Sequence, residues 1–145
     1  MTQEQKDLLL KDLCARLPYG VKCEIKGYKE VYTLNRIEID YENGHLFDFK
    51  EQKNGFNMQV YSSEVKPYLF PMSSMTKKQE SEYDDLDFNP LYDAMEHKYN
   101  GIEEYMQLIS KSKIDPIQWC YKNHFDCRGL IEKGLAIDAT NLNIY

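Results

Sequence analysis

The stretch VKCEIKGYKEVYTLNRIEIDYENGHLFDFKEQKNGFNMQVY, residues 21–61, decides the fold of this chain. Four short runs in it alternate apolar and polar residues, which is typical of strands with one buried face. These runs are residues 21–25, 32–39, 45–49 and 56–61. Gly27 follows the first run, and Asn-Gly pairs at 43–44 and 54–55 separate the later ones. Because Asn-Gly favours turns that match the twist of paired strands, the stretch predicts an antiparallel sheet.

The residues before the sheet predict a helix. Thr2 and Gln5 have the spacing of a capping box, and Pro18 ends the segment. Arg16 falls in the last turn, where a cation offsets the helix dipole. Five apolar residues recur at helical spacing and predict a face that packs on the sheet: Leu9, Leu10, Leu13, Cys14 and Leu17.

Two prolines at positions 67 and 71 interrupt the run that follows the sheet. Proline cannot donate a ladder hydrogen bond, so residues 65–71 are predicted to form an edge strand or an extended crossing. The number of short strands and tight turns fits four or five antiparallel strands, in a curved sheet or a small barrel. Periodicity alone leaves both arrangements open.

The C-terminal third is predicted to be mainly helical. Thr76 and Gln79 repeat the capping box before a helix that should reach about Leu86, and further helices should start at 89–90, 100 and 115–116. Asp126 is expected to cap a turn containing Leu130 and Ile131. Residues 135–139 predict a short strand returning to the sheet, and residues 140–145 are expected to fray. The whole chain, 1–145, is therefore predicted to be one α+β domain: helix plus sheet over 1–71, then mainly helix over 72–145.

The charge of the chain is unevenly placed. Residues 76–104 hold nine acidic residues and three lysines, and this excess equals the net charge of −6. Direct binding to nucleic acid requires a basic surface, so the composition argues against it. The acidic segment could instead meet a basic partner protein or be a solvated helix face. The candidate contacts to a partner are Asp84, Asp85 and Asp87.

The chain contains no run of about 18 apolar residues that could cross a membrane. Its first residues are polar and lack the pattern of a signal peptide. We therefore expect a cytoplasmic protein without membrane contact, in which Cys14, Cys23, Cys120 and Cys127 are reduced thiols.

Two kinds of catalytic or metal site deserve comparison with simpler explanations. Cys120, His124 and Cys127 have a C-x3-H-x2-C spacing, but structural zinc normally uses a second ligand pair that is missing, so we expect no metal or other cofactor. A thiol enzyme built on Cys127 and His124 is a further alternative, although no oxyanion-hole loop accompanies the pair. The chain also lacks a P-loop, a dinucleotide fingerprint and an HExxH motif. We therefore expect a protein that is not an enzyme.

The chain has only three arginines, at positions 16, 36 and 128, among eighteen basic residues. The planar guanidinium suits a carboxylate or a phosphate better than lysine does, so an anionic ligand should contact these side chains. The simpler explanation is that each arginine ties a loop to the core through a carbonyl or Asp126. The full set of candidate ligand-binding residues is Arg128, His124, Asp126, Arg36, Arg16 and Tyr19.

Three phrases of the sequence resemble a known group of proteins. They are DLCARLPYGV at 12–21, VKPYLFPMSSMT at 65–76, and NHFD with RGLI at 123–126 and 128–131. They are similar to a family of small uncharacterised proteins from phages and mobile elements of gut bacteria. The likeness covers about two thirds of the chain, and residues 84–113 look like a variable insert. The family has no established activity, so the resemblance implies a bacterial cytoplasm and a phage-related role but no catalytic residue.

Taken together, these observations predict a non-enzymatic, self-associating phage-type binding protein. It would act on a host protein through the acidic segment or a sheet face, as counter-defence inhibitors do. The alternative is a sponge that sequesters a nucleotide-derived signal between arginine and tyrosine side chains.

Overall fold

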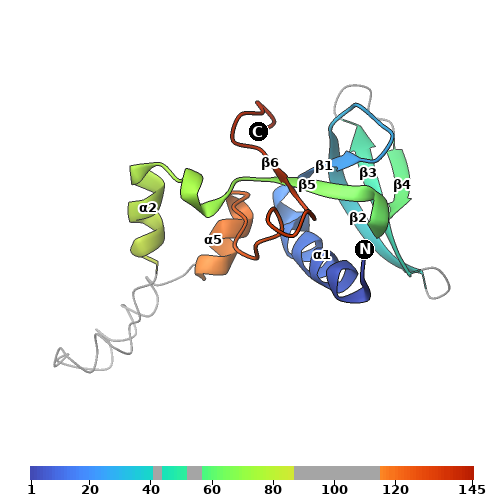
Figure 1. Cartoon of the computed structure of the whole chain (residues 1–145), viewed down its shortest axis with the longest axis horizontal. Coiled ribbons are helices and arrows are strands. Elements are labelled where there is room, and N and C mark those ends of the chain that lie inside the picture. Colours follow the sequence, from blue (N-terminus) through green and yellow to red (C-terminus); the bar gives the residue numbers. More distant parts are fainter. Residues whose placement is uncertain (41–43, 52–56, 87–114) are drawn as a thin grey trace. The chain divides into compact units, whose positions relative to one another are not determined.

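A six-stranded sheet carries the fold in this computed structural model, which describes residues 1–40, 44–51, 57–86 and 115–145 (Figure 1). The strands lie in the order β4-β3-β2-β1-β5-β6. Their bounds are Lys22–Ile25 for β1, Tyr32–Asp40 for β2, Gly44–Glu51 for β3, Asn57–Tyr61 for β4, Val65–Leu69 for β5 and Ile137–Asp138 for β6. The α+β class is confirmed, whereas a barrel is wrong because the sheet does not close. The expectation of four or five antiparallel strands is also corrected, because β6 joins β5 in parallel.

The two hairpins predicted from the Asn-Gly pairs are present. β2 pairs with β3 as far as Asp40 opposite Gly44, and β3 pairs with β4 as far as Lys50 opposite Asn57. The residues between the paired ends, 41–43 and 52–56, lie outside the described residues. A bulge in β2 between Leu34 and Arg36 interrupts the register. Because a bulge adds one residue to its strand, Arg36 comes to lie opposite Asp48.

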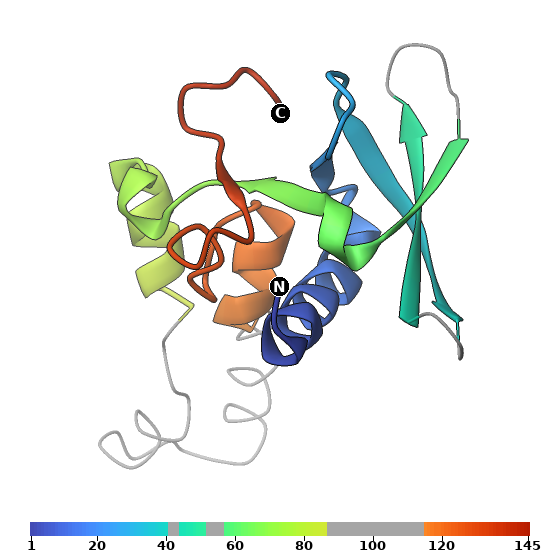
Figure 2. The same cartoon turned by 45° about the vertical axis from the view of Figure 1, so that its right-hand side comes forward.

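The N-terminal helix α1, Gln3–Arg16, packs along one face of the sheet (Figure 2). The predicted capping box of Thr2 and Gln5 is present, and the 3-10 turn η1, Leu17–Tyr19, follows the helix. Leu9 and Leu13 join the core formed by the inner sides of the strands. The prediction for Cys14 is wrong, because that thiol is exposed. The buried positions also include Asp12 and Arg16, which lie on the same helix face.

β5 differs from the expected edge strand, because it lies between β1 and β6. It follows the 3-10 turn η2, Ser62–Glu64, and leads to a second turn η3, Met72–Ser74. The Lys26 N–H donates to the Glu64 carbonyl at 2.8 Å. Hydrogen-bonded and non-hydrogen-bonded pairs alternate along an antiparallel ladder. Pro67, which lies opposite Cys23, therefore falls at a position without hydrogen bonds to β1. On the other side β6 pairs only with Tyr68 and Leu69. Proline is tolerated here because its missing N–H would have had no ladder partner.

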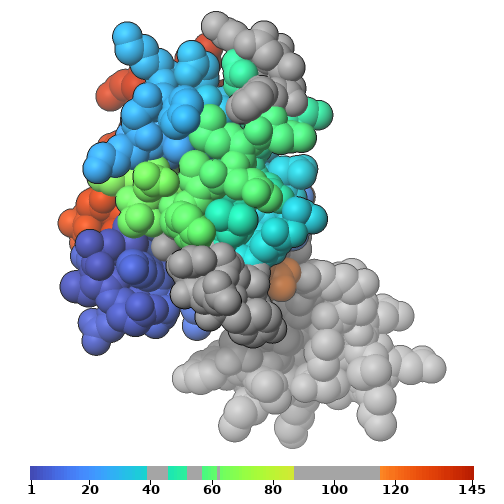
Figure 3. Space-filling model, turned by 90° about the vertical axis from the view of Figure 1, so that its right-hand side faces the viewer, coloured from blue at the N-terminus to red at the C-terminus, as the bar shows by residue number. Residues whose placement is uncertain are grey.

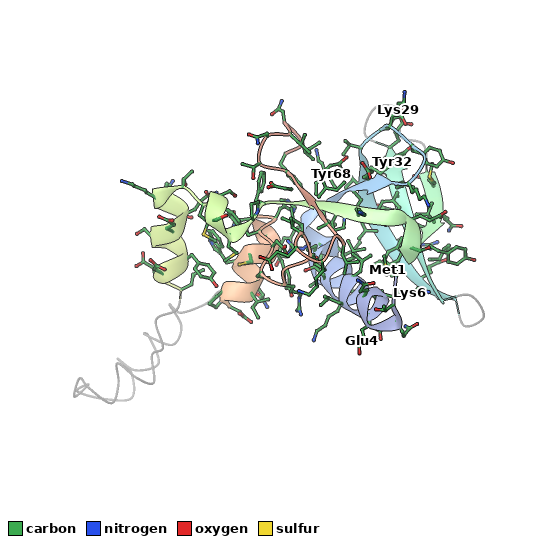
Figure 4. The ribbon with its side chains drawn as sticks, viewed as in Figure 1. Met1, Glu4, Lys6, Lys29, Tyr32 and Tyr68 are labelled. Carbon is green, nitrogen blue, oxygen red and sulfur yellow. The ribbon has the colours of Figure 1, made fainter. Side chains whose placement is uncertain are left out.

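The segment after α5, Pro116–Lys122, returns to β5 instead of continuing as helix. The Phe70 N–H donates to the His124 carbonyl at 2.9 Å, and the Asp126 N–H donates to the Phe70 carbonyl at 2.8 Å. The predicted strand after residue 135 is confirmed as β6. The expected fraying of the tail is wrong, because the Tyr145 hydroxyl donates to the carbonyl of Tyr68 at 2.9 Å. Tyr68 lies on β5 beside this stretch (Figure 4).

The described residues form two compact units, Met1–Ser74 with Cys120–Tyr145, and Met75–Trp119. The second unit contains α2, Lys77–Asp84, whose Thr76 capping box is confirmed and whose end lies two residues before the expected Leu86. Asp115 caps the start of α5 as predicted. The helices expected at 89–90 and 100, and Asp87, lie outside the described residues. Among the helices that the structure describes, none has the length and apolar character needed to span a bilayer.

Candidate functional site

Asp12 and Arg16 form a fully buried ion pair, one turn apart on α1. The Arg16 Nε donates to Asp12 Oδ2 at 2.6 Å, and Nη2 donates to Oδ1 at 3.2 Å. Both side chains have 0% exposure. Arg16 Nη2 also donates to the backbone carbonyl of Phe125 at 2.8 Å, so this arginine joins the N-terminal helix to the C-terminal segment. A buried pair of this kind is favourable only when further hydrogen bonds satisfy both partners.

Tyr121 and Arg128 extend this pair into a cluster of four side chains, which we term the arginine cluster: Asp12, Arg16, Tyr121 and Arg128. The Tyr121 ring lies 4.9 Å from the Arg16 guanidinium carbon, and its hydroxyl accepts from Arg128 Nε at 2.7 Å. Arg128 Nη2 donates to the same oxygen. Arg128 Nε lies 3.8 Å from Asp12 Oδ1, and its side chain is 23% exposed. Arg128 is thus the member of the cluster that solvent reaches.

Burial sets the protonation behaviour of the arginine cluster. It raises the pKa of Asp12, and the hydrogen bonds from Arg16 oppose that rise. Burial likewise raises the pKa of the Tyr121 hydroxyl, against the lowering effect of Arg128. Arg16 Nη1 is buried without a hydrogen-bond partner among the residues that the structure describes.

Asp126 acts as the cap that the sequence predicts. Its Oδ1 accepts from the Leu130 N–H at 2.9 Å, and its Oδ2 accepts from the Ile131 N–H at 2.8 Å. Gly129 within this turn has a φ of +66°, and a Cβ there would lie 3.0 Å from Lys133 Nζ. Both carboxylate oxygens therefore hold the turn, and a ligand would have to compete with them.

His124 has a left-handed backbone, with a φ of 60°, and its ring stacks on Tyr145 with centroids 3.9 Å apart. Burial and the nearby Arg16 and Lys22 lower the pKa of His124 to about 4, so the ring is neutral at pH 7. The Tyr145 hydroxyl accepts from the Lys22 N–H at 3.1 Å. His124 therefore belongs to the packing of the tail.

The remaining predicted site residues lie in other places. Tyr19 is exposed in η1. Asp84 is the last residue of α2 and Asp85 is its C-cap, and both are exposed. Arg36 lies on β2, where Nε donates to Asp48 Oδ2 at 2.7 Å and Nη2 pairs with Glu38. The sequence-based set thus divides, since Arg16, His124, Asp126 and Arg128 gather at the C-terminal segment and Arg36 pairs with strand residues.

Arg36 lines a shallow open groove of about 570 Å³ on β2, β3 and β4. Its other lining residues are mainly hydrogen-bonding ones: Asn35, Asp48, Phe49, Asn57 and Gln59. Arg36 lies opposite Asp48, which lies opposite Gln59, so the three form one row across the strands. Asp48 Oδ1 is buried and has no hydrogen-bond partner within the described part of the chain. We term this feature the strand groove. Figure 3 shows a surface to which β3 and β4 contribute.

Sequence reasoning missed Asp12, Tyr121, Asp48 and Gln59. Asp12 carried a usable signal, because it lies four residues before Arg16 on the predicted apolar face. The row through Asp48 and Gln59 follows from the register of the two hairpins, once the bulge in β2 is included.

The pairing that a Cys/His enzyme requires is not among the contacts of these two residues in the described structure. Cys120 is the side chain that lowers the pKa of Cys127 most, whereas the His124 ring stacks on Tyr145. No group of three or more His, Cys, Asp or Glu side chains in the described ranges is arranged to hold a metal ion. The arrangement can therefore offer a reactive thiol and hydrogen-bonding surfaces.

Comparison of the chain with protein-family models, with curated proteins and with solved structures gives no match.

Proposed function

We propose that this chain is a small non-enzymatic binding protein of the phage type that works in the bacterial cytoplasm and inhibits a host protein by occupying its surface. The observation that supports this proposal is a contrast between two places. The arginine cluster is buried except at Arg128, whereas the strand groove presents hydrogen-bonding groups to solvent. A surface of that kind suits a partner better than a reaction.

The strand groove favours a partner that supplies hydrogen-bond donors. Asp48 Oδ1 is an acceptor that lacks a donor in the described chain, and an unpaired buried acceptor costs about 1–3 kcal/mol. A partner reaches this atom only if the Asp48 side chain turns outward, and a donor on the partner then recovers that cost. Arg36 and Gln59 on either side supply further donors and acceptors. Tyr61 lies on the same strand as Gln59 with 40% of its surface exposed, and tyrosine is common at interfaces.

Site-specific photocrosslinking tests this interface. A benzophenone amino acid is placed at Gln59 in one variant and at Lys11, an exposed position on α1, in the control. Both variants are expressed in the bacterial host and irradiated. We expect one defined host polypeptide to be crosslinked at Gln59 and not at Lys11, and Arg36→Glu to reduce its yield at least tenfold. Equal crosslinking at both positions, or none at Gln59, would overturn the proposal.

The acidic end of α2 is a second candidate surface for the same function. Asp84 and Asp85 lie at the C-terminus of this helix, where negative charge is unfavourable for the helix dipole. Asp84→Lys together with Asp85→Lys should weaken binding to a basic partner and reduce the salt dependence of that binding. Unchanged binding would leave the strand groove as the interface.

A sponge for a nucleotide-derived signal is the alternative function, and Arg128 is the observation in its favour. This side chain is part-exposed, and its guanidinium suits a phosphate group. Native mass spectrometry of protein purified from bacterial cytoplasm separates the two functions and reports any self-association. A bound mass of a few hundred daltons that is lost in Arg128→Ala supports the sponge, and a bare chain supports a protein partner.

A further inference from the structure

Cys120 and Cys127 meet where α5 ends. Cys120 lies in the last turn of that helix, and the chain folds back over the next seven positions. The Phe125 N–H donates to the Cys120 carbonyl at 2.8 Å, and the Cys127 N–H donates to the Phe125 carbonyl at 3.1 Å. Cys120 is also the side chain that lowers the pKa of the Cys127 thiol most. Backbone contacts therefore hold this pair together, and it does not arise from chance neighbours on the surface.

The two thiols have different access to solvent. Cys120 is fully buried and its Sγ lies 3.9 Å from the Met72 Sδ, whereas Cys127 is half-buried. A small solute can thus reach Cys127 first. Met72 is a thioether and cannot form a disulfide with Cys120, which leaves Cys127 as the thiol that follows it in the chain.

The surroundings of Cys127 favour its thiolate. The hydrogen bond from Cys120 lowers the pKa of Cys127 to about 7, and Arg16 and Arg128 act in the same direction. Burial and Asp12 oppose this effect. The other two cysteines differ, because partial loss of solvent raises the pKa of Cys14 and full burial raises that of Cys23. Cys127 therefore has a larger thiolate fraction near neutral pH than Cys14 or Cys23.

We propose that Cys127 is an oxidation site for small hydroperoxides and that Cys120 is its resolving thiol. This arrangement of an accessible thiolate beside a second thiol is typical of redox-sensing cysteines. The inference is independent of the binding function proposed above, because it uses no residue of the strand groove.

The reaction has two steps. The Cys127 thiolate attacks one peroxide oxygen, the O–O bond breaks, and hydroxide leaves and takes up a proton, which gives a sulfenic acid and water. The Cys120 sulfur then attacks the Cys127 sulfur, the S–O bond breaks, and the oxygen leaves as water with the Cys120 proton. Two thiols lose two hydrogens in total and hydrogen peroxide becomes two waters. A dithiol such as dithiothreitol reverses the oxidation by thiol–disulfide exchange.

The disulfide would fix α5 to the turn that Asp126 caps. Cys120 is the residue at which the chain re-enters the first compact unit after Met75–Trp119. Oxidation would therefore place a covalent bond at this junction and remove a thiolate from beside Arg16 and Arg128.

The test treats the full reduced chain with hydrogen peroxide and follows it by intact mass and peptide mapping. We expect a loss of two hydrogens, a Cys120–Cys127 crosslink within the monomer, and full reversal by dithiothreitol. At pH 7, iodoacetamide should modify Cys127 roughly five- to tenfold faster than the exposed Cys14, because a larger thiolate fraction outweighs its lower nucleophilicity.

Two variants and a control distinguish the roles of the thiols. Cys120→Ser should stop at the sulfenic acid, which dimedone traps on Cys127, and Cys127→Ser should leave Cys120 unreacted. Cys14→Ser should behave as the parent chain does. Circular dichroism checks that each variant is folded. The intact-mass measurement of the crosslink uses the parent chain, so it does not depend on the folding of any variant. Faster reaction at Cys14, or overoxidation of Cys127 in the parent chain without a crosslink, would overturn the proposal.

Discussion

Arg16 has the most constrained environment of the three arginines. It has no exposed surface, and both Asp12 and the Phe125 carbonyl accept hydrogen bonds from it. Breaking a buried pair is costly because the remaining charge stays in a poorly solvated place. Replacing both members with apolar residues of similar volume costs much less, because no charge then remains.

Asp12→Asn should therefore lower the free energy of unfolding by about 3–5 kcal/mol. Urea titration followed by circular dichroism measures the change. Asp7→Asn, on the exposed side of the same helix, is the matched control and should stay within about 0.5 kcal/mol of the parent chain. Asp12→Leu combined with Arg16→Met should recover part of the loss. A small effect of Asp12→Asn alone would contradict the role of the pair.

His124 should make stability depend on pH. Its pKa is lowered to about 4 in the folded chain, below its ordinary value of 6.5. The unfolded chain thus binds a proton first as the pH falls. The neutral His124 ring therefore contributes to the free energy of unfolding above pH 6.5, and this contribution is lost as the pH falls through about 4. Because the ring is part-exposed, we expect a loss of about 1–2 kcal/mol, less than the full shift implies.

Urea midpoints between pH 7.5 and pH 4 measure this dependence on the parent chain and on His124→Asn. Asparagine tolerates the left-handed backbone at this position and does not titrate. The variant should lose less stability over this range than the parent chain does. Parallel curves for the two proteins would contradict the assignment.

Among the elements, β5 contacts several segments that are distant in the sequence, and its own residues do not predict these contacts. It pairs with β1 and β6, and Phe70 just after it pairs with residues 124 and 126. The Tyr145 hydroxyl closes this arrangement, since it donates to Tyr68 and accepts from Lys22. The tail is therefore held by the sheet.

Tyr145→Phe tests that attachment. The change removes one hydroxyl that serves two backbone groups, so the free energy of unfolding should fall by about 1–2 kcal/mol. Amide exchange at Lys22 should become faster. Tyr28→Phe, at an exposed tyrosine, is the control and should change neither quantity. If Lys22 exchange is unaltered in Tyr145→Phe, the tail is not anchored through its hydroxyl.

Local signals predicted the elements well, and long-range contacts explain the errors. Both capping boxes and the Asp126 cap depend on residues at most five apart, and all three are confirmed. The β2 bulge is also visible in the sequence pattern. The buried Leu34 and the partly buried Ile37 are three positions apart, whereas residues on one face of a regular strand are two apart. The place of Pro67 in the sheet depends on where β6 begins, and the attachment of the tail depends on Lys22 and Tyr68. No window of sequence contains those pairs.

The candidate site shows the same division. The sequence selected Arg16, His124, Asp126 and Arg128, and the structure gathers them around one segment. The sequence did not predict that Asp12 and Tyr121 accept hydrogen bonds from the arginines, because these side chains come from different elements. Asp126 was predicted both as a cap and as a ligand, and its two oxygens are used in the cap.

For the whole molecule, the first compact unit is built from two separate parts of the chain, Met1–Ser74 and Cys120–Tyr145. The ends that border the second unit are close in space, because Met72 Sδ lies 3.9 Å from Cys120 Sγ. A linker of about six Gly and Ser residues, with a root-mean-square span of roughly 13 Å, is long enough to join them.

Replacing residues 75–119 with that linker should leave the first unit folded. We expect a single cooperative urea transition by circular dichroism, and slow amide exchange at Phe47 and Phe49 as in the full chain. A chain in which only residues 1–74 are expressed is the control and should lack that transition, because it has no β6 and no Phe125 carbonyl. Loss of cooperativity in the linker variant would show that the first unit requires residues 75–119.

The hydrogen bond from Arg16 to Phe125 joins residues 109 positions apart. At typical synthesis rates of about 5–20 residues per second, a ribosome adds Phe125 roughly 5–20 s after Arg16. During that interval α1 and the three strands of the hairpins can form, but the guanidinium still lacks its carbonyl acceptor and β5 still lacks β6. The nascent chain must therefore wait, in a partly folded state accessible to chaperones, until its last quarter leaves the exit tunnel.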